Sequence, residues 1–217
     1  MFEEIKANFE KNADPKQAKM LKKYMRDQFE FYGLHTPIRR NCYHEFLKEE
    51  KKTKKINWNL LNLAWSDEHR ESQYFVCDYL ITMQKYISYE DMPKIEKFVR
   101  SKQWWDTIDS LIKPIGKLGL RDKQVNDLML KWSLDSNIWV KRVAIEHQLL
   151  RKDKMNTILL EQILLNNLDS DEFFINKAIG WALRDYSKTN PDWVKSFVKQ
   201  NQNHLASLSI KEGCKYL

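Results

Sequence analysis

The stretch DEFFINKAIGWALRDYS, residues 171–187, decides which fold the sequence predicts. Successive residues of an α-helix are rotated by about 100°, so side chains three and four positions apart share a face. On such a helix one face is apolar and consists of Ile175, Ala178, Ile179, Ala182, Leu183 and Tyr186. The opposite face carries rings and cations, namely Phe173, Phe174, Lys177, Trp181 and Arg184. The stretch therefore predicts an amphipathic helix with an unusual outer face.

Two interpretations of this outer face stay open. Rings interleaved with cations suit a surface that stacks on a flat ligand and neutralises its charge. Helical repeats also bury two faces of a helix, so the same residues suit packing against a neighbouring helix pair. Gly180 lies inside the helix, where glycine costs about 1 kcal/mol relative to alanine. That cost indicates a close approach by a backbone or a ligand.

The remaining chain also favours helix over strand. Only five glycines and five prolines interrupt its 217 residues, and no segment alternates as a strand does. The signals predict helices over 14–32, 36–47, 103–117 and 137–151, among others, with Gly33 as a left-handed cap after the first. Helix pairs recurring about every 35 to 40 residues are typical of an α-solenoid. We therefore predict an all-α fold of stacked antiparallel helix pairs in one domain, 1–217.

Composition narrows the classes of protein and partner. The net charge of +7 favours polyanionic partners such as nucleic acid. No apolar run approaches the roughly 20 residues that span a bilayer, and the first residues carry no export signal, so we expect a cytoplasmic protein with no membrane partner. The cysteines are scattered and match no metal-ligand spacing, which predicts reduced thiols and no metal: Cys42, Cys77 and Cys214.

A candidate anionic site lies in the predicted helix 103–117. Trp105 lies at the margin of its apolar stripe, and Asp109 follows one turn later beside it. A carboxylate at an apolar border, shielded by an indole, suits a catalytic anion. An ordinary aspartate favoured by the helix dipole explains the spacing equally simply, and on spacing alone it is the better explanation. An Asp109 held in an internal salt bridge, far from any positively lined channel, would contradict the catalytic interpretation.

Arg142 falls inside the apolar face of the predicted helix 137–151. A buried guanidinium needs a carboxylate or phosphate partner, because an unpaired buried charge is costly. It is therefore either half of a structural ion pair or a cation on the floor of a groove, aimed at a phosphate. No nucleotide-binding glycine loop, zinc-protease motif or nucleophile–histidine pattern competes for the chemistry. The residues alone leave three functions nearly level: a DNA-processing enzyme, a non-catalytic module for distorted DNA, and a peptide-binding solenoid.

Four segments then resemble one family along nearly the whole chain. Tyr24-Met25 leads into FYGLHTPIRR at 31–40, and WWDTID stands at 104–109. NIWVKRVAI occupies 137–145 and FFINKAIGWALRDY occupies 173–186. Together these segments resemble the AlkD-like DNA alkylation repair family. The resemblance implies a HEAT-like α-solenoid whose basic concave face holds duplex DNA.

The resemblance also implies an activity and its residues. The activity is that of a monofunctional glycosylase that removes purines alkylated at N3 or N7 from duplex DNA. Asp109 matches the family's catalytic carboxylate, and Trp105 and Trp181 match the tryptophans that flank it. Arg142 matches the family's DNA-contacting arginine, and Tyr24 matches an aromatic of its DNA-facing groove. We also expect Lys177, Arg184, Arg39 and Arg40 to contact DNA. His35 departs from the pattern, since glutamine is expected before Thr-Pro.

The chemistry of such a lesion agrees with these residues. A purine alkylated at N3 or N7 is already cationic, so it leaves without a general acid. Asp109 can stabilise an oxocarbenium-like sugar and position water, and each indole face adds a cation–π attraction of about 0.5–2 kcal/mol. We expect no cofactor, a monomer, and double-stranded DNA with alkylated purines as the partner. Base flipping stays an open question.

Overall fold

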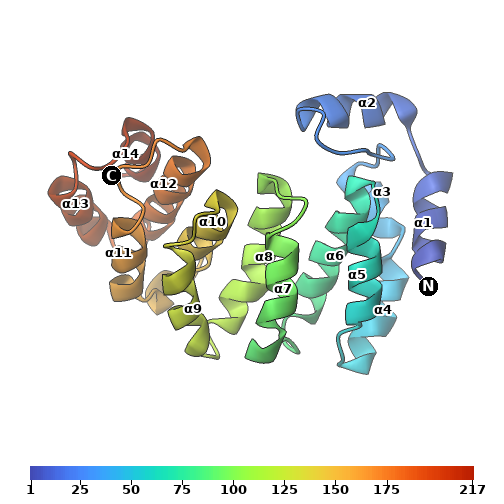
Figure 1. Ribbon diagram of the computed structural model, residues 1–217. Coiled ribbons are helices and arrows are strands. Elements are labelled where there is room, and N and C mark those ends of the chain that lie inside the picture. The colour runs from blue at the N-terminus through green and yellow to red at the C-terminus, as the bar shows by residue number, and fades with distance from the viewer. The chain divides into compact units, whose positions relative to one another are not determined.

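The computed structural model describes residues 1–217 and contains fourteen α-helices, two short 3-10 helices and no β-strand (Figure 1). The predicted all-α class is therefore confirmed. The chain divides into two compact units, an N-terminal unit, Met1–Ser88, and a C-terminal unit, Tyr89–Leu217. The prediction of one domain over the whole chain stays a prediction. No helix is both long and apolar enough to cross a membrane.

The N-terminal unit is built around the pair of helices α5 and α6. Helix α4 packs on α6, α1 packs on α5, and α3 leads into α4 (Figure 1). Its core is aromatic, with Tyr43 and Phe75 in edge-on contact at 5.2 Å between ring centroids. The helices are α1 (Phe2–Lys11), α2 (Pro15–Tyr24), α3 (Thr36–Asn41), α4 (His44–Thr53), α5 (Trp58–Ser66) and α6 (Arg70–Met83).

The predicted helix 14–32 is too long, since α2 ends at Tyr24. Arg26 and Asp27 follow with left-handed backbone, at φ 57° and 58°, which stops the helix. Gly33 has φ 92°, and a Cβ atom there would lie 2.1 Å from the Asp14 carbonyl oxygen. Its left-handed backbone therefore serves the loop rather than a helix cap. In place of helix partners, the buried Glu71 carboxylate accepts the Gly33 backbone N–H at 2.9 Å.

The predicted helix 36–47 is in fact two helices, α3 and α4. The break is at Tyr43, whose backbone leaves the helical region at φ −131° and ψ 10°. The break lets the Tyr43 ring enter the core, where it meets Phe9 as well as Phe75. Burial of an aromatic ring outweighs the helical propensity of the segment.

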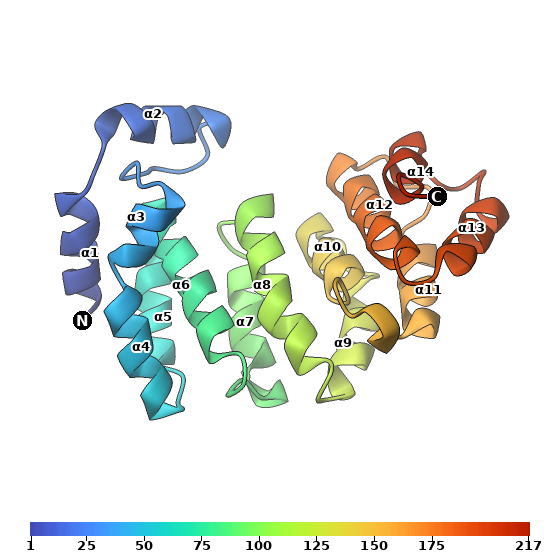
Figure 2. The same cartoon turned by 180° about the vertical axis from the view of Figure 1, so that it is seen from behind.

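The C-terminal unit is made of paired helices in two layers. Helices α8, α10 and α12 follow one another in one layer, and α7, α9 and α11 form the other (Figures 1 and 2). Helix α14 packs closely on α12. The helices are α7 (Met92–Val99), α8 (Trp105–Leu118), α9 (Gln124–Trp132), α10 (Ile138–Glu146), α11 (Thr157–Leu165), α12 (Phe173–Ser187), α13 (Pro191–Gln200) and α14 (Ser207–Gly213).

The contact between α12 and α14 explains the glycine within α12. A Cβ atom at Gly180 would lie 2.6 Å from Cβ of Glu212 and 3.3 Å from the Ser209 carbonyl oxygen. Only a residue without a side chain permits this spacing, so the expected close approach to Gly180 is confirmed and comes from α14. The same approach brings Glu212 to the outer face of α12.

Candidate active site

Three consecutive helices of one layer carry the residues predicted to act in chemistry. Trp105 and Asp109 lie on α8, Arg142 on α10 and Trp181 on α12. Because α10 packs against both α8 and α12, side chains from the three helices can meet. The layer thus gathers residues that are far apart in the sequence.

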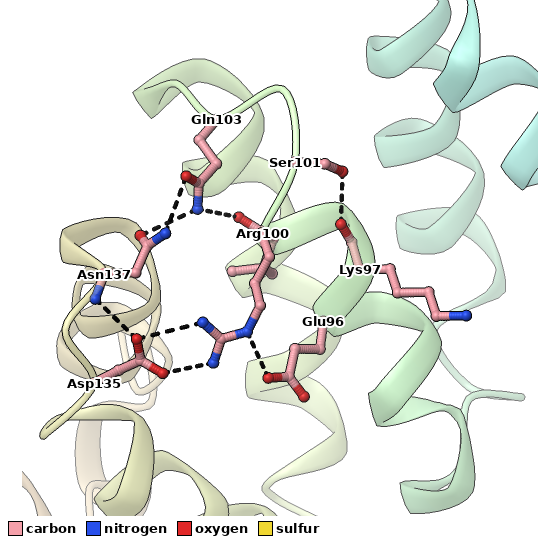
Figure 3. Close-up of polar contacts among 8 residues, drawn as sticks. Glu96, Lys97, Arg100, Ser101, Gln103, Asp135 and Asn137 are labelled. Carbon is pink, nitrogen blue, oxygen red and sulfur yellow. Dashed lines mark hydrogen bonds and ion pairs between the residues drawn. The ribbon is translucent and has the colours of Figure 1, made fainter.

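A polar network fixes where α8 and α10 begin (Figure 3). Gln103 and Asn137 exchange two hydrogen bonds, each 3.1 Å long, between their side-chain amides. The Gln103 amide also donates to the Val99 carbonyl at 2.7 Å, and the Asn137 carboxamide oxygen caps α10 by accepting the Trp139 N–H at 2.9 Å. The residues just before α8 and α10 are therefore locked to each other.

An arginine reinforces the same junction. Arg100, at the end of α7, donates to both oxygens of Asp135 at 3.3 and 2.5 Å (Figure 3). It also donates to Glu96 at 2.7 Å. The Asp135 carboxylate in turn accepts the Asn137 N–H at 2.8 Å. This network thus joins the segments that precede α8 and α10, and Asp109 and Arg142 lie about one turn into these helices.

Asp109 and Arg142 form a two-bond ion pair across α8 and α10. Nε and Nη2 of Arg142 donate to the two Asp109 oxygens at 2.9 and 3.0 Å, and Nη1 donates to the Phe174 carbonyl of α12 at 2.8 Å. Arg142 is 1% exposed, whereas Asp109 is 22% exposed. The structural ion pair considered for Arg142 is therefore present. Asp109 is likewise held in an internal salt bridge, with part of its carboxylate still open to solvent.

A second carboxylate, which the sequence reasoning missed, lies against the same guanidinium. Glu146 is one turn after Arg142 on α10, and its Oε1 lies 2.9 Å from Nη2 of Arg142. Its side chain is fully buried and neither oxygen accepts a hydrogen bond. Burial raises the pKa of Glu146 well above its usual range, the Asp109 carboxylate adds to the rise, and Arg142 opposes it. Its four-residue spacing from Arg142 was the available signal.

Trp181 brings its ring to the guanidinium of the pair. The Arg142 guanidinium carbon lies 5.1 Å from the Trp181 ring centroid, and that of Arg184 lies 5.9 Å away. Both distances are within cation–π range. The half-buried ring of Trp181 thus lies next to the Asp109 pair and already attracts positive charge.

An aromatic cluster extends the site along α12. Trp104, Trp139 and Phe174 are in mutual contact, with ring centroids 4.7 to 5.5 Å apart. Phe173 meets Phe174 edge-on at 5.3 Å and is itself exposed. The half-buried Phe174 therefore packs on Trp104 and Trp139, while Phe173 is exposed. The two phenylalanines predicted on the outer face thus have different surroundings.

The cations of the outer face of α12 are both paired with α14. Glu212 accepts a hydrogen bond from Lys177 at 2.7 Å and from Arg184 at 2.6 Å. Hydrogen bonding to Lys177 lowers the pKa of Glu212, with smaller contributions from the charges of Lys177 and Arg184. Helix α14 therefore covers part of this face, and the choice between a packing face and a ligand-binding face stays open. Both cations stay about a quarter exposed, at 27% each.

The predicted DNA-binding residues of the N-terminal unit differ in exposure. Arg39 is buried, and its Nε donates to the Tyr43 hydroxyl at 3.2 Å. Arg40 is largely exposed and donates from Nε and Nη2 to Asp78, both at 3.0 Å. Tyr24, at the end of α2, is 67% exposed. Their contact with DNA stays a prediction.

Comparison with known proteins decides the family. Residues 5–217 match a protein family described as DNA alkylation repair enzyme. The chain belongs to this family. It is 32% identical to a solved structure described as a predicted DNA alkylation repair enzyme from Enterococcus faecalis, with a TM-score of 0.87 over 94% of this chain and 96% of that one. The predicted family is thereby confirmed, and so is an α-solenoid type of fold similar to DNA alkylation repair enzymes.

Two further comparisons give no additional information on function. The crystal structure of smu.31 from Streptococcus mutans UA159 shares 20% identity, with a TM-score of 0.60 over 82% of this chain and 97% of that one. That likeness concerns the fold alone. No curated protein matches the chain. Membership of the family supports a role in the repair of alkylated DNA, and within the structure no group of histidine, cysteine and acidic residues is arranged to hold a metal ion.

Proposed function

We propose that this DNA alkylation repair protein is a monofunctional glycosylase that hydrolyses the N-glycosidic bond of N3- and N7-alkylated purines in duplex DNA. One observation carries the proposal. The Asp109 carboxylate is fixed by Arg142, is partly exposed, and belongs to a cluster that includes the Trp181 ring. A fixed anion beside an indole suits a reaction in which positive charge develops on a sugar.

The leaving purine does not have to be protonated by the enzyme. The alkylated purine carries a positive charge, and it takes the electron pair of the breaking C1′–N bond to leave as a neutral base. Water adds its oxygen to C1′, and its proton passes to Asp109 and then to solvent. The net products are the free base, an abasic sugar and one proton. Because the base leaves as a neutral molecule, the reaction requires no general acid.

Asp109 would act on the sugar and on the water at once. A carboxylate has about four lone-pair positions, and the two hydrogen bonds from Arg142 use two of them. The remaining positions on the open side can accept a hydrogen bond from water and face a cationic C1′. Arg142 reduces the net charge but holds the oxygens in place, and removal of such an organised charge typically costs about 10²–10³ in rate.

Trp181 and Trp105 would select for the cationic lesion. A ring face attracts a positive charge by about 0.5–2 kcal/mol, whereas a neutral base gains no such attraction. Trp181 already lies within cation–π distance of two arginines, Arg142 and Arg184. Trp105 lies one turn before Asp109 on α8. The same rings would therefore favour both the bound lesion and the cationic transition state.

The basic residues would hold the DNA backbone. Lys177 and Arg184 already bind one carboxylate, that of Glu212, which a phosphate would replace or approach. Phosphate contacts fix the register of a protein on a duplex without reading its sequence. We propose this role for Lys177, Arg184 and Arg40, and a contact of the exposed Tyr24 ring with the same backbone. Arg39 is buried and bonded to Tyr43, so it can contact a phosphate only by exchanging a partner. Arg142 can contact a phosphate only by exchanging a partner, because its hydrogen bonds go to Asp109 and Phe174.

A second candidate function is a non-catalytic module for damaged or distorted DNA. The salt bridge between Asp109 and Arg142 favours it, since a paired carboxylate is also what a purely structural role requires. The two functions differ in one assay, the release of free base from a duplex with a single N7-methylguanine. Under single-turnover conditions with excess protein, the glycosylase releases 7-methylguanine and the Asp109→Asn variant does not.

A binding module gives a different pattern in the same assay. It retains the duplex with an affinity that falls steeply with salt, yet no base is released above the spontaneous rate. Release that is equal for wild type and Asp109→Asn would remove Asp109 from the mechanism. A duplex without the lesion serves as the control for the specificity of the release.

A further inference from the structure

The cluster behind Asp109 has one acidic group more than it has basic groups. Arg142 is the cation of the cluster, and Asp109 and Glu146 both lie against it. If both acids were ionised, the buried cluster would carry a net negative charge. An uncompensated buried charge is costly, and a group in this situation usually becomes neutral instead. Of the two acids, Glu146 is fully buried and Asp109 is partly exposed.

The hydrogen bonds lead to the same assignment. Both Asp109 oxygens accept from Arg142, whereas neither Glu146 oxygen accepts from any group. As a carboxylate, Glu146 would have only the ion-pair contact of Oε1 with Arg142 and no hydrogen bond to either oxygen in a dry site, which is unfavourable. As a carboxylic acid it gains an O–H donor, and its neighbour Asp109 offers an acceptor. The contact of 2.9 Å with Nη2 of Arg142 places the carbonyl oxygen of that acid against the guanidinium.

We propose that Glu146 is a positioning residue: as a neutral carboxylic acid it keeps the Arg142 guanidinium turned toward Asp109 and thereby holds the catalytic carboxylate in place. The role of this position in the reaction rests on the proposed glycosylase function. Two donors from α10 meet at Asp109. One is the Arg142 guanidinium, and the other is the O–H group of Glu146, one turn later on the same helix. Asp109 stays the one formal negative charge.

The raised pKa of Glu146 agrees with this geometry and gives it a pH dependence. The charged groups that face Glu146 are Arg142 on its own helix, α10, and Asp109 on α8. Helix α12 contributes the Phe174 carbonyl to the same guanidinium. As the pH rises through the pKa of Glu146, the acid loses its proton, competes with Asp109 for Arg142 and withdraws its own donor. The rate of base excision should therefore fall as the pH rises above the pKa of Glu146.

Variants of Glu146 test the proposal through excision. Glu146→Gln keeps the shape and offers an N–H donor without a charge, so single-turnover release of 7-methylguanine should stay within about three-fold of wild type at neutral pH. Glu146→Leu removes the polar group, and a misplaced Asp109 should slow release by at least about ten-fold while DNA affinity is unchanged. The alkaline decline should be absent in Glu146→Gln. Glu45→Gln, at an exposed position of α4, is the matched control.

Nuclear magnetic resonance tests the positioning independently of activity. The carboxyl carbon signal of Glu146, identified by its loss in Glu146→Gln, should titrate above the range of exposed glutamates. The Nε–H signal of Arg142 should be protected from exchange in wild type and Glu146→Gln and lose protection in Glu146→Leu. Titration of Glu146 in the ordinary range, or a Glu146→Gln protein as slow as Glu146→Leu, would overturn the proposal. Absence of base release by wild type, with the resonance results as expected, would overturn the glycosylase function alone.

Discussion

Each unit of the molecule holds a partly buried aspartate that is paired with arginine, and the two clusters differ in their balance of charge. In the N-terminal unit, Asp78 accepts two hydrogen bonds from Arg40 and one of 2.7 Å from the Tyr43 hydroxyl, and Arg39 lies 3.6 Å away. In the C-terminal unit, Asp109 has a single arginine, which a second acid also contacts. The first cluster has more arginines than acids, and the second has more acids than arginines.

This difference separates a carboxylate that serves stability from one suited to chemistry. The Asp78 oxygens are bonded on several sides, and burial is the largest effect on its pKa and would raise it. Hydrogen bonds from Arg40 and Tyr43, and the charge of Arg39, nevertheless hold that pKa below its ordinary value. Asp109 keeps an open side and has Trp181 beside its arginine. An anion that is fixed but not enclosed is what a cationic transition state requires.

Removal of an arginine from each cluster gives the largest expected contrast. Arg142→Met leaves Asp109 and Glu146 without their cation, and loss of one partner of a buried pair costs about 3–5 kcal/mol. Because Asp109 is partly exposed, we expect the lower end of that range for Arg142→Met. Arg40 is largely exposed, and Asp78 keeps two other partners, so Arg40→Met should cost about 1 kcal/mol or less. Urea denaturation followed by circular dichroism measures both, and equal losses would contradict the comparison.

Replacement of Asp109 or Asp78 by asparagine should show which of the two carboxylates affects the rate of base release. Asp109→Asn keeps the shape but removes the charge, and single-turnover release of 7-methylguanine should fall by about 10²–10³ or more while the duplex is still bound. Asp78→Asn should leave that rate within about three-fold, because saturating protein removes effects on affinity. If Asp78→Asn slowed release as strongly as Asp109→Asn, the effect would lie in the fold rather than in the reaction.

The same Asp78→Asn variant should change how stability depends on pH. A carboxylate whose folded pKa is lowered contributes stability above its unfolded pKa, near 3.9, and loses it as the pH falls through the folded pKa. Charged hydrogen bonds of this kind contribute about 1.5–3 kcal/mol. We therefore expect wild type to exceed Asp78→Asn in unfolding free energy by that amount at pH 6, and the gap to close below pH 4. A gap that stays constant with pH would point to packing instead.

The sequence predicts the helices that carry these clusters better than it predicts the ion pairs between side chains of different helices. Helical periodicity identifies α8, α10 and α12 and assigns Arg142 to an apolar face, because these signals are local. The pairing of Arg142 with Asp109 joins residues on different helices, and spacing alone cannot supply it. Glu146 lies one turn after Arg142 and was within reach of local reasoning. Glu212 was not, since it meets Lys177 only through the packing of α14 on α12.

The rings of the two clusters allow a smaller test. Trp181 lies 5.1 Å from the Arg142 guanidinium, and Tyr74 lies 4.4 Å from that of Arg39. If Trp181 also attracts the cationic lesion, Trp181→Ala should slow release of 7-methylguanine by about 2- to 30-fold, which corresponds to 0.5–2 kcal/mol. Tyr74→Ala should not change the single-turnover rate. An unchanged rate in Trp181→Ala would limit that ring to packing on Arg142 and Arg184.

The smallest expected effect concerns Lys177, which is tied to Glu212 much as Arg40 is tied to Asp78. If Lys177 exchanges Glu212 for a phosphate, Lys177→Ala should lower the slope of log K against log salt by about 0.9, with fluorescence anisotropy on a labelled duplex as the measurement. Lys195→Ala, at an exposed position of α13, should leave the slope unchanged. An unchanged slope in Lys177→Ala would mean that the ion pair with Glu212 persists on DNA. Any contact of the outer face of α12 with the duplex would then be made by Arg184, Phe173 or Trp181 rather than by Lys177.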